Sequence, residues 1–143
     1  MSSFKVFDIA GSGMSAESVR LNTVASNLAN ADSVSGDPSQ VYQAKHPVFQ
    51  TVQALGAAAS QTVEQASASV KVAAIAANQA APESRYDPSN PLANSEGYVY
   101  SSNVNVVEEM TDMISASRSY QNNVEVMNTA RNLMLDTLKL GQS

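Results

Sequence analysis

The glycines near the N-terminus are the residues whose spacing first suggests chemistry. Gly11-Ser-Gly13-Met-Ser-Ala16 matches G-x-G-x-x-A, the pattern that lets a backbone approach a pyrophosphate, and Asp32 stands where a ribose-binding acid is expected. A dinucleotide-binding fold also needs a second strand that ends near this acid. Residues 21–31 carry helical periodicity instead, and no further strand–helix alternation follows. We therefore interpret the two glycines as small residues in a helix that begins loosely.

The other residue types that catalyse reactions or bind metals lack partners in this chain. His46 is the only histidine, and cysteine is absent, which excludes thiolate zinc sites and cysteine nucleophiles. Asp32 and Asp37 flank Gly36, but the spacing of a calcium loop and its closing glutamate are missing. The sequence therefore predicts a protein that is not an enzyme and that has no cofactor and no metal.

The composition excludes several classes of partner. The net charge is −5 and no cluster of Lys and Arg occurs, so we expect binding neither to nucleic acid nor directly to lipid. Hydrophobic residues make up 43% of the chain, but many are Ala, Trp is absent and Phe occurs three times. We therefore expect a small core, to which partner helices add burial. The start of the chain has no secretory hydrophobic region, so export would not use an ordinary cleaved signal.

Two segments carry the periodicity of long helices, and the first runs from residue 3 to about 31. Its apolar and small residues alternate with spacings of three and four, which places them on one seam, as in a coiled coil. The seam positions are Phe4, Phe7, Gly11, Met14, Ser18, Leu21, Ala25 and Leu28. Asn22, Asn27 and Asn30 accompany this seam. Amides at such positions fix register through hydrogen bonds, although a solvated face explains them as well.

The second helix is expected from residue 105 to about 140. Asn105 is a suitable N-cap, and Gly141 is suitable just after the end. The acidic residues of the first turns suit the positive end of the helix dipole; they are Glu108, Glu109 and Asp112. The seam positions are Val106, Met110, Met113, Ser117, Tyr120, Val124, Met127, Arg131, Met134 and Leu138. Further apolar residues flank this seam, which indicates contact with more than one neighbouring helix; they are Val107, Ile114 and Leu135 on one side and Val126, Leu133 and Leu140 on the other.

The middle of the chain has a different character. Turn-forming residues predict a loop at 32–40, and the Ala/Ser/Gln-rich stretch at 54–69 is interpreted as a loop or weak helix. Short strands are expected within 41–52, where Pro47 marks an edge or bend, and also at 70–75 and 97–100. The predicted fold is mainly α, with long N- and C-terminal helices pairing as a coiled coil and a small middle segment that is partly β and partly irregular. The corresponding divisions of the chain are 1–33, 34–103 and 104–143.

Both predicted helices also resemble those of a known family. Residues 21–33, LNTVASNLANADS, resemble the N-terminal signature of the bacterial flagellar axial proteins, which include rod and hook proteins. Residues 115–134, SASRSYQNNVEVMNTARNLM, with LKLG at 138–141, resemble their C-terminal signature. Two more motifs, FDIAG at 7–11 and YDPSNPLAN at 86–94, narrow the resemblance to the proximal rod.

The resemblance implies a structural subunit of the flagellar basal-body rod, the drive shaft that transmits torque across the periplasm. The terminal helices would pack against those of other copies and of other proximal and distal rod proteins in a helical tube. The chain would reach this tube unfolded and uncleaved through the flagellar type III export apparatus, and an adaptor between rod and membrane ring is a further candidate partner. The residues expected at subunit interfaces are Phe4, Phe7, Met14, Leu21, Asn22, Ala25, Asn27, Leu28, Asn30, Val106, Met110, Met113, Ile114, Tyr120, Val124, Met127, Arg131, Met134 and Leu138.

A helical adaptor or export chaperone is the alternative function that the same pattern allows. Such a protein would use its apolar seams to bind a client instead of a copy of itself. A folded, protease-resistant monomer in the cytoplasm would favour this alternative.

Overall fold

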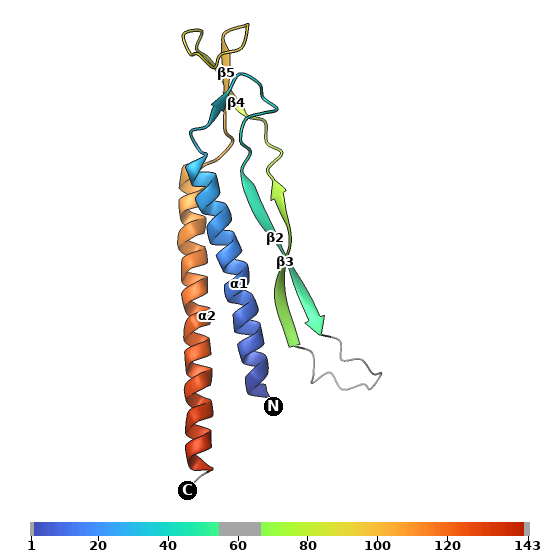
Figure 1. The fold of residues 1–143 in the computed structure, drawn as a ribbon, viewed down its shortest axis with the longest axis vertical. Coiled ribbons are helices and arrows are strands. Elements are labelled where there is room, and N and C mark those ends of the chain that lie inside the picture. Colours follow the sequence, from blue (N-terminus) through green and yellow to red (C-terminus); the bar gives the residue numbers. More distant parts are fainter. Residues whose placement is uncertain (1, 55–66, 142–143) are drawn as a thin grey trace.

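The computed structural model describes residues 2–54 and 67–141 of the chain. Within these residues the chain forms two long helices, a long hairpin and a small three-stranded sheet (Figure 1). The elements in chain order are α1 (Ser2–Ala29), β1 (Val34–Ser35), β2 (Lys45–Ala54), β3 (Ser67–Ala77), β4 (Glu83–Tyr86), β5 (Tyr98–Ser101) and α2 (Val106–Leu140).

The two helices begin and end close to where the sequence predicts. In α2 the side-chain oxygen of Asn105 accepts from the N–H groups of Val107, at 3.1 Å, and Glu108, at 3.4 Å, which confirms the N-cap. Gly141 follows the last helical residue and donates its N–H to the carbonyl of Thr137 at 3.1 Å. Gly11 and Gly13 lie inside α1, so the predicted helix is confirmed there and the dinucleotide-binding loop is excluded.

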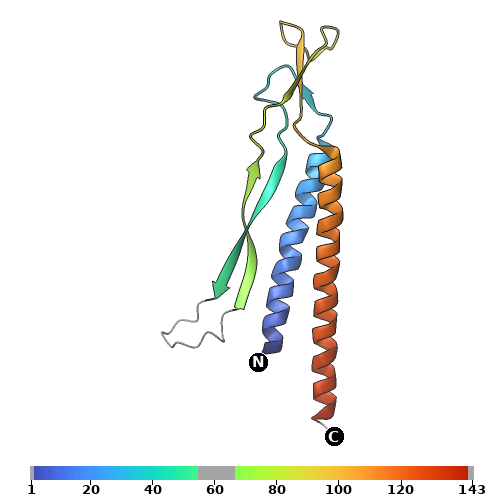
Figure 2. The ribbon, with the colours of Figure 1, turned by 180° about the vertical axis from the view of Figure 1, so that it is seen from behind.

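The strands form two separate antiparallel units. Strands β2 and β3 pair along their whole length, from Lys45 opposite Ala77 to Ala54 opposite Ser67, with an irregularity between Val48 and Phe49. The small sheet has the strand order β1-β5-β4 and brings segments together that lie on both sides of the hairpin in the sequence. It therefore closes the middle of the chain onto itself beyond the end of the helix pair (Figures 1 and 2).

The hairpin runs alongside α1, which has α2 as its other neighbour (Figures 1 and 2). Ser12 ties the hairpin to the helix, because its hydroxyl donates to the carbonyl of Ile9 at 2.8 Å and accepts from the N–H of Val70 at 3.1 Å. A hydroxyl in α1 thus satisfies a backbone donor of β3. As a result, α1 is packed on two sides within one chain, whereas α2 is packed against α1 alone among the described elements.

The prediction of a mainly α fold with a coiled coil is wrong, because the structure combines α and β elements. The alternating residues of 45–54 and 67–77 form one hairpin with strands of 10 and 11 residues instead of short isolated strands. Strand β4 lies between the strands expected at 70–75 and 97–100 and was not predicted. The expected loop or weak helix at 54–69 is strand at both ends, and its part at 55–66 lies outside the described residues.

Small side chains dominate the contact between the helices, and this is the physical reason why a coiled coil does not describe it. Ala10 and Ala16 of α1 and Ala116 of α2 are buried, whereas large seam residues are half-buried or exposed. A Cβ atom placed on Gly13 would lie 2.9 Å from Nδ2 of Asn123, so the side chain of Asn123 in α2 packs directly against the backbone of α1 there. Interlocking large side chains of the coiled-coil type are not what holds this pair together.

Candidate assembly interface

Asn27 connects three elements at the end of α1, and its side chain is 0% exposed. Its Nδ2 donates to the carbonyl of Lys45 and to Oε1 of Glu109, both at 2.8 Å. Its Oδ1 accepts from the N–H of Lys45 at 2.9 Å and from the hydroxyl of Tyr42 at 3.0 Å. All the hydrogen-bonding positions of the amide are therefore used. We call these four residues (Asn27, Tyr42, Lys45 and Glu109) the Asn27 hub.

The hub contains a carboxyl group that is unusually well buried. Glu109 is 2% exposed, and its Oε2 is buried without a hydrogen-bond partner. Burial raises the pKa of the Glu109 carboxyl above its ordinary value, because the charged form loses its hydration; the hydrogen bond from Asn27 works in the opposite direction. The hub thus joins α1, the start of β2 and the first turn of α2. At its centre is the Glu109 carboxyl group, of which one oxygen accepts a hydrogen bond from Asn27.

An ion pair forms a second polar contact between the helices, one turn along α2 from Glu109. The guanidinium of Arg20 in α1 donates to Oδ1 of Asp112 in α2 at 2.8 Å. Glu17, in the preceding turn of α1, lies 3.9 Å from the same guanidinium. These polar contacts set the register of the two antiparallel helices.

The expected interface residues fall into groups in the structure. Half-buried positions follow the contact between the elements; they are Phe7, Met14, Leu21, Leu28, Asn30, Met113, Val124, Met127 and Met134. Exposed positions are Asn22, Ala25, Val106, Met110, Ile114, Tyr120, Arg131 and Leu138. Asn27 is buried in the hub, and the side chain of Phe4 lies outside the described residues. Whether these residues meet another subunit stays a prediction.

An apolar groove of about 580 Å³ opens where the helices diverge. It lies between the start of α1 and the second half of α2, and its lining is mostly apolar. The lining residues are Val6, Asn122, Glu125, Val126, Thr129, Ala130 and Leu133. In chemical terms it suits a side chain or a helix with apolar residues, because it contains few groups that would orient a polar ligand.

The last turns of α2 extend beyond the start of α1 (Figure 1). They carry several exposed leucines. Their exposed fractions are 62% for Leu133, 43% for Leu135, 61% for Leu138 and 76% for Leu140. Large apolar side chains gathered on one exposed element mark a surface that associates with other proteins.

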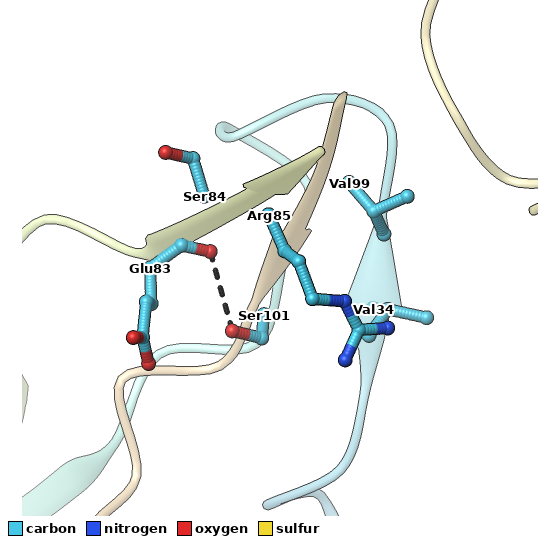
Figure 3. Close-up of a pocket in the computed structure, with 6 residues that line it drawn as sticks. All are labelled: Val34, Glu83, Ser84, Arg85, Val99 and Ser101. Carbon is cyan, nitrogen blue, oxygen red and sulfur yellow. Dashed lines mark hydrogen bonds between the residues drawn. The ribbon is translucent and has the colours of Figure 1, made fainter. Parts of the chain in front are cut away.

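A second cavity, of about 240 Å³, lies in the three-stranded sheet and is shown in Figure 3. It is lined by Val34, Glu83, Ser84, Arg85, Val99 and Ser101. Its polar groups are used locally: the hydroxyl of Ser101 donates to the carbonyl of Glu83 at 3.2 Å, and Arg85 lies 3.7 Å from Asp87. This arrangement pairs strands and shows no geometry for catalysis.

The described part of the chain holds no cluster of three or more His, Cys, Asp or Glu residues with the geometry of a metal site. Neither of its helices combines the length and the apolar character needed to cross a bilayer.

Comparison with known families places both helices in one class of protein. Residues 7–36 match the family described as "Flagella basal body rod protein". Residues 95–140 match "Flagellar basal body rod FlgEFG protein C-terminal". The segments that form both helices are therefore those of a flagellar basal-body rod protein.

Full-length relatives identify the particular family. The chain is 52% identical to the flagellar basal-body rod protein FlgC of Salmonella typhimurium over 142 residues, covering 99% of this chain and 100% of that protein. Identity to FlgC of Escherichia coli O6:H1 is 53% with the same coverage, and to FlgC of Buchnera aphidicola from Acyrthosiphon pisum it is 41% over 144 residues. The chain belongs to the FlgC family and is a structural component of the flagellar basal-body rod.

The Asn27 hub is the feature that the sequence did not reveal. The sequence predicts a register-setting role for the Asn27 amide, but no spacing or motif connects it to its partners Lys45 and Glu109. Asn27 and Glu109 are 82 residues apart in the chain, and Glu109 has an adequate local explanation as an acid near a helix start. One signal in the sequence could have revealed the hub: Glu109 is a glutamate on the buried side of a predicted helix.

Proposed function

We propose that the chain polymerises through its terminal helices with neighbouring rod subunits, and that the resulting helical tube transmits torque mechanically, without catalysis. The observation that carries this proposal is the large apolar surface of α2 that is exposed in the described part of the chain. A monomer with this much exposed apolar surface on one helix gains free energy when a neighbour covers it.

The uncovered surface of α2 has two apolar flanks. Buried Glu109 and Ala116 mark the line of α2 that faces α1. At roughly 100° per residue, Met110, Ile114 and Leu135 lie to one side of this line, and Val126, Leu133 and Leu140 lie to the other. The side opposite α1 carries Arg118 and Asp136. This distribution suits a helix with α1 on one side, a neighbouring subunit on each flank and water behind it.

Contacts of this kind are heterologous, because each flank meets a different surface of the next subunit. Heterologous contacts that do not close into a ring generate a helical filament. Many roughly parallel helix contacts would then share the load when the shaft is twisted. At either end of the stack formed by this chain, other rod proteins would occupy one of the flanks.

The small core agrees with export of an unfolded chain through the flagellar type III apparatus. The buried hydrophobic residues among those described are Ala and Val alone: Ala10, Ala16, Val24, Val41, Ala44, Val99 and Ala116. Such a core stabilises the monomer little, so unfolding before export costs little free energy, and assembly contributes the missing burial.

A matched pair of variants tests the assembly surface. Ile114→Asp puts a charge on an apolar flank, at a side chain that is 55% exposed, whereas Thr111→Asp puts the same charge on an exposed residue of the side opposite α1. We expect Ile114→Asp to be exported but absent from purified basal bodies, with loss of swimming in a strain that lacks the native chain. Thr111→Asp should assemble and swim. Normal swimming of the Ile114→Asp strain would contradict the proposal.

A further inference from the structure

The Asn27 hub leaves one strong acceptor unsatisfied. Oε1 of Glu109 accepts from Nδ2 of Asn27 at 2.8 Å, whereas Oε2 is buried and accepts no hydrogen bond from the described residues, in a residue that is only 2% exposed. The carboxylate form would therefore place its negative charge on a buried oxygen without a donor among these residues. Buried groups in this situation are stabilised when they become neutral.

The charges around Glu109 come from each element that meets at the hub. His46, on β2, favours the carboxylate when its ring carries a proton. Glu108 and Asp112, on α2, disfavour it. From α1, Arg20 lies toward the hub, but its guanidinium is engaged by Asp112 at 2.8 Å. The ammonium of Lys45 lies over the ring of Tyr42, 5.4 Å from its centroid, so it does not neutralise the acid directly.

The position of the hub links this acid to a mechanical element. The amide of Asn27 holds Lys45, the first residue of β2, through both its N–H and its carbonyl. Lys45 is also the end of the hairpin at which β2 and β3 leave the helix pair for the small sheet. A change at Glu109 is therefore transmitted through one buried side chain to the base of the hairpin.

We propose that Glu109 is a proton-linked latch: when its carboxyl is protonated the base of the β2–β3 hairpin is held firmly against the two helices, and loss of the proton loosens it. This role is independent of which proteins surround the chain in the rod. It makes the attachment of the hairpin respond to pH.

The direction of the response follows from the burial of the acid. Burial raises the pKa of Glu109 in the folded chain above its value in the unfolded chain. A raised carboxyl pKa means that the folded hub binds its proton more tightly than the unfolded chain does. The stabilisation is then fully present below the unfolded pKa and is lost as the pH rises through the folded pKa.

The N–H of Lys45 reports directly on the latch, because it donates to Oδ1 of Asn27 at 2.9 Å. Its hydrogen-exchange protection factor, the ratio of intrinsic to observed exchange rate, would be measured in the full chain by NMR from pH 5 to pH 8. The N–H of Ser102, which donates to the carbonyl of Ser33 at 3.1 Å, serves as an internal control outside the hub. Using protection factors removes the pH dependence of the exchange chemistry itself.

The matched variant is Glu109→Gln, which keeps the oxygen that accepts from Asn27 but cannot ionise. In the native chain we expect the protection of Lys45 to fall about tenfold between pH 5 and pH 8, since a buried, unpaired acceptor of this kind is costly. In Glu109→Gln the protection should stay constant, and in both chains that of Ser102 should change much less. A Lys45 N–H with the same pH dependence in both chains, or one unprotected in the native chain at every pH, would overturn the latch.

Discussion

The guanidinium of Arg20 and the carboxylate of Asp112 meet at 2.8 Å and join α1 to α2 by a charge-assisted hydrogen bond. Their side chains are 25% and 33% exposed, so water screens this pair only in part. Because the contact between the helices consists largely of small side chains, a directed polar bond is needed to define how far one helix slides along the other. This pair and the Asn27 hub fix the register of the two helices, and both lie within three turns of the end of α1.

Removing one side of the pair should weaken the helix contact. We expect Asp112→Asn to lower the free energy of unfolding by about 1 kcal/mol, as measured by urea denaturation of the isolated chain. The loss is limited because Glu17 remains 3.9 Å from the guanidinium. A double-mutant cycle with Arg20→Met separates the pair from the packing of the arginine stem. A coupling free energy of zero would show that the ion pair contributes nothing.

Two asparagines of α1 should respond very differently to the same substitution. Asn27→Ala removes four hydrogen bonds and leaves buried groups of Lys45 and Glu109 unpaired, so we expect a loss of about 3 kcal/mol. Asn22 is exposed, and Asn22→Ala should change the stability by less than about 0.5 kcal/mol. Thermal denaturation followed by circular dichroism measures both. Equal effects would mean that the hub does not form.

The two glycines of α1 provide a second matched comparison. A Cβ on Gly11 meets nothing within 4 Å, so Gly11→Ala should stabilise the chain by about 0.5–1 kcal/mol through helix propensity alone. A Cβ on Gly13 would lie 2.9 Å from Nδ2 of Asn123, whose amide must then move. Gly13→Ala should therefore gain clearly less than Gly11→Ala in urea denaturation. A larger gain at Gly13 would indicate that the helices do not approach closely there.

The helix ends could be predicted from sequence because their causes are local. Asn105 and Gly141 act on groups within a turn of themselves, and a single chain displays these spacings directly. The hairpin was underestimated because β3 is rich in Ala and Ser, which lack the bulk that identifies a strand. The hub was missed because its members are distant in sequence, and only the closure of the chain brings them together.

The burial of the seam residues could be predicted from their spacing only in part. A spacing of three and four identifies residues that share a side of a helix, but it does not say what covers that side. Met113 and Met127 are half-buried along the pair, whereas Met110 and Ile114 are exposed. The sequence predicted one broad surface, and the structure divides it into a part used within the chain and a part left uncovered.

The charge of His46 should shift the pH at which the hairpin base loosens. Because the protonated ring lowers the pKa of Glu109, His46→Gln removes a charge that opposes the effect of burial. The folded pKa of Glu109 then rises, and the latch should stay closed to a higher pH than in the native chain. The midpoint of the loss of Lys45 protection measures this shift. A midpoint that moves to lower pH would contradict the assigned role of His46.

Stability and assembly should separate at Leu133, which lies in the apolar groove and is 62% exposed. Leu133→Asp removes little burial in the isolated chain, so its free energy of unfolding should change by no more than about 0.5 kcal/mol. In a rod, however, a neighbour that fills the groove would have to bury the new carboxylate without a partner, which opposes incorporation strongly. Mass spectrometry of purified basal bodies should find the variant absent although the chain is exported, while Thr111→Asp, on the side of α2 opposite α1, is incorporated. Incorporation of Leu133→Asp at the native level would mean that the groove faces water in the rod, and the proposed flank contact would then have to be restricted to the side of Met110 and Ile114.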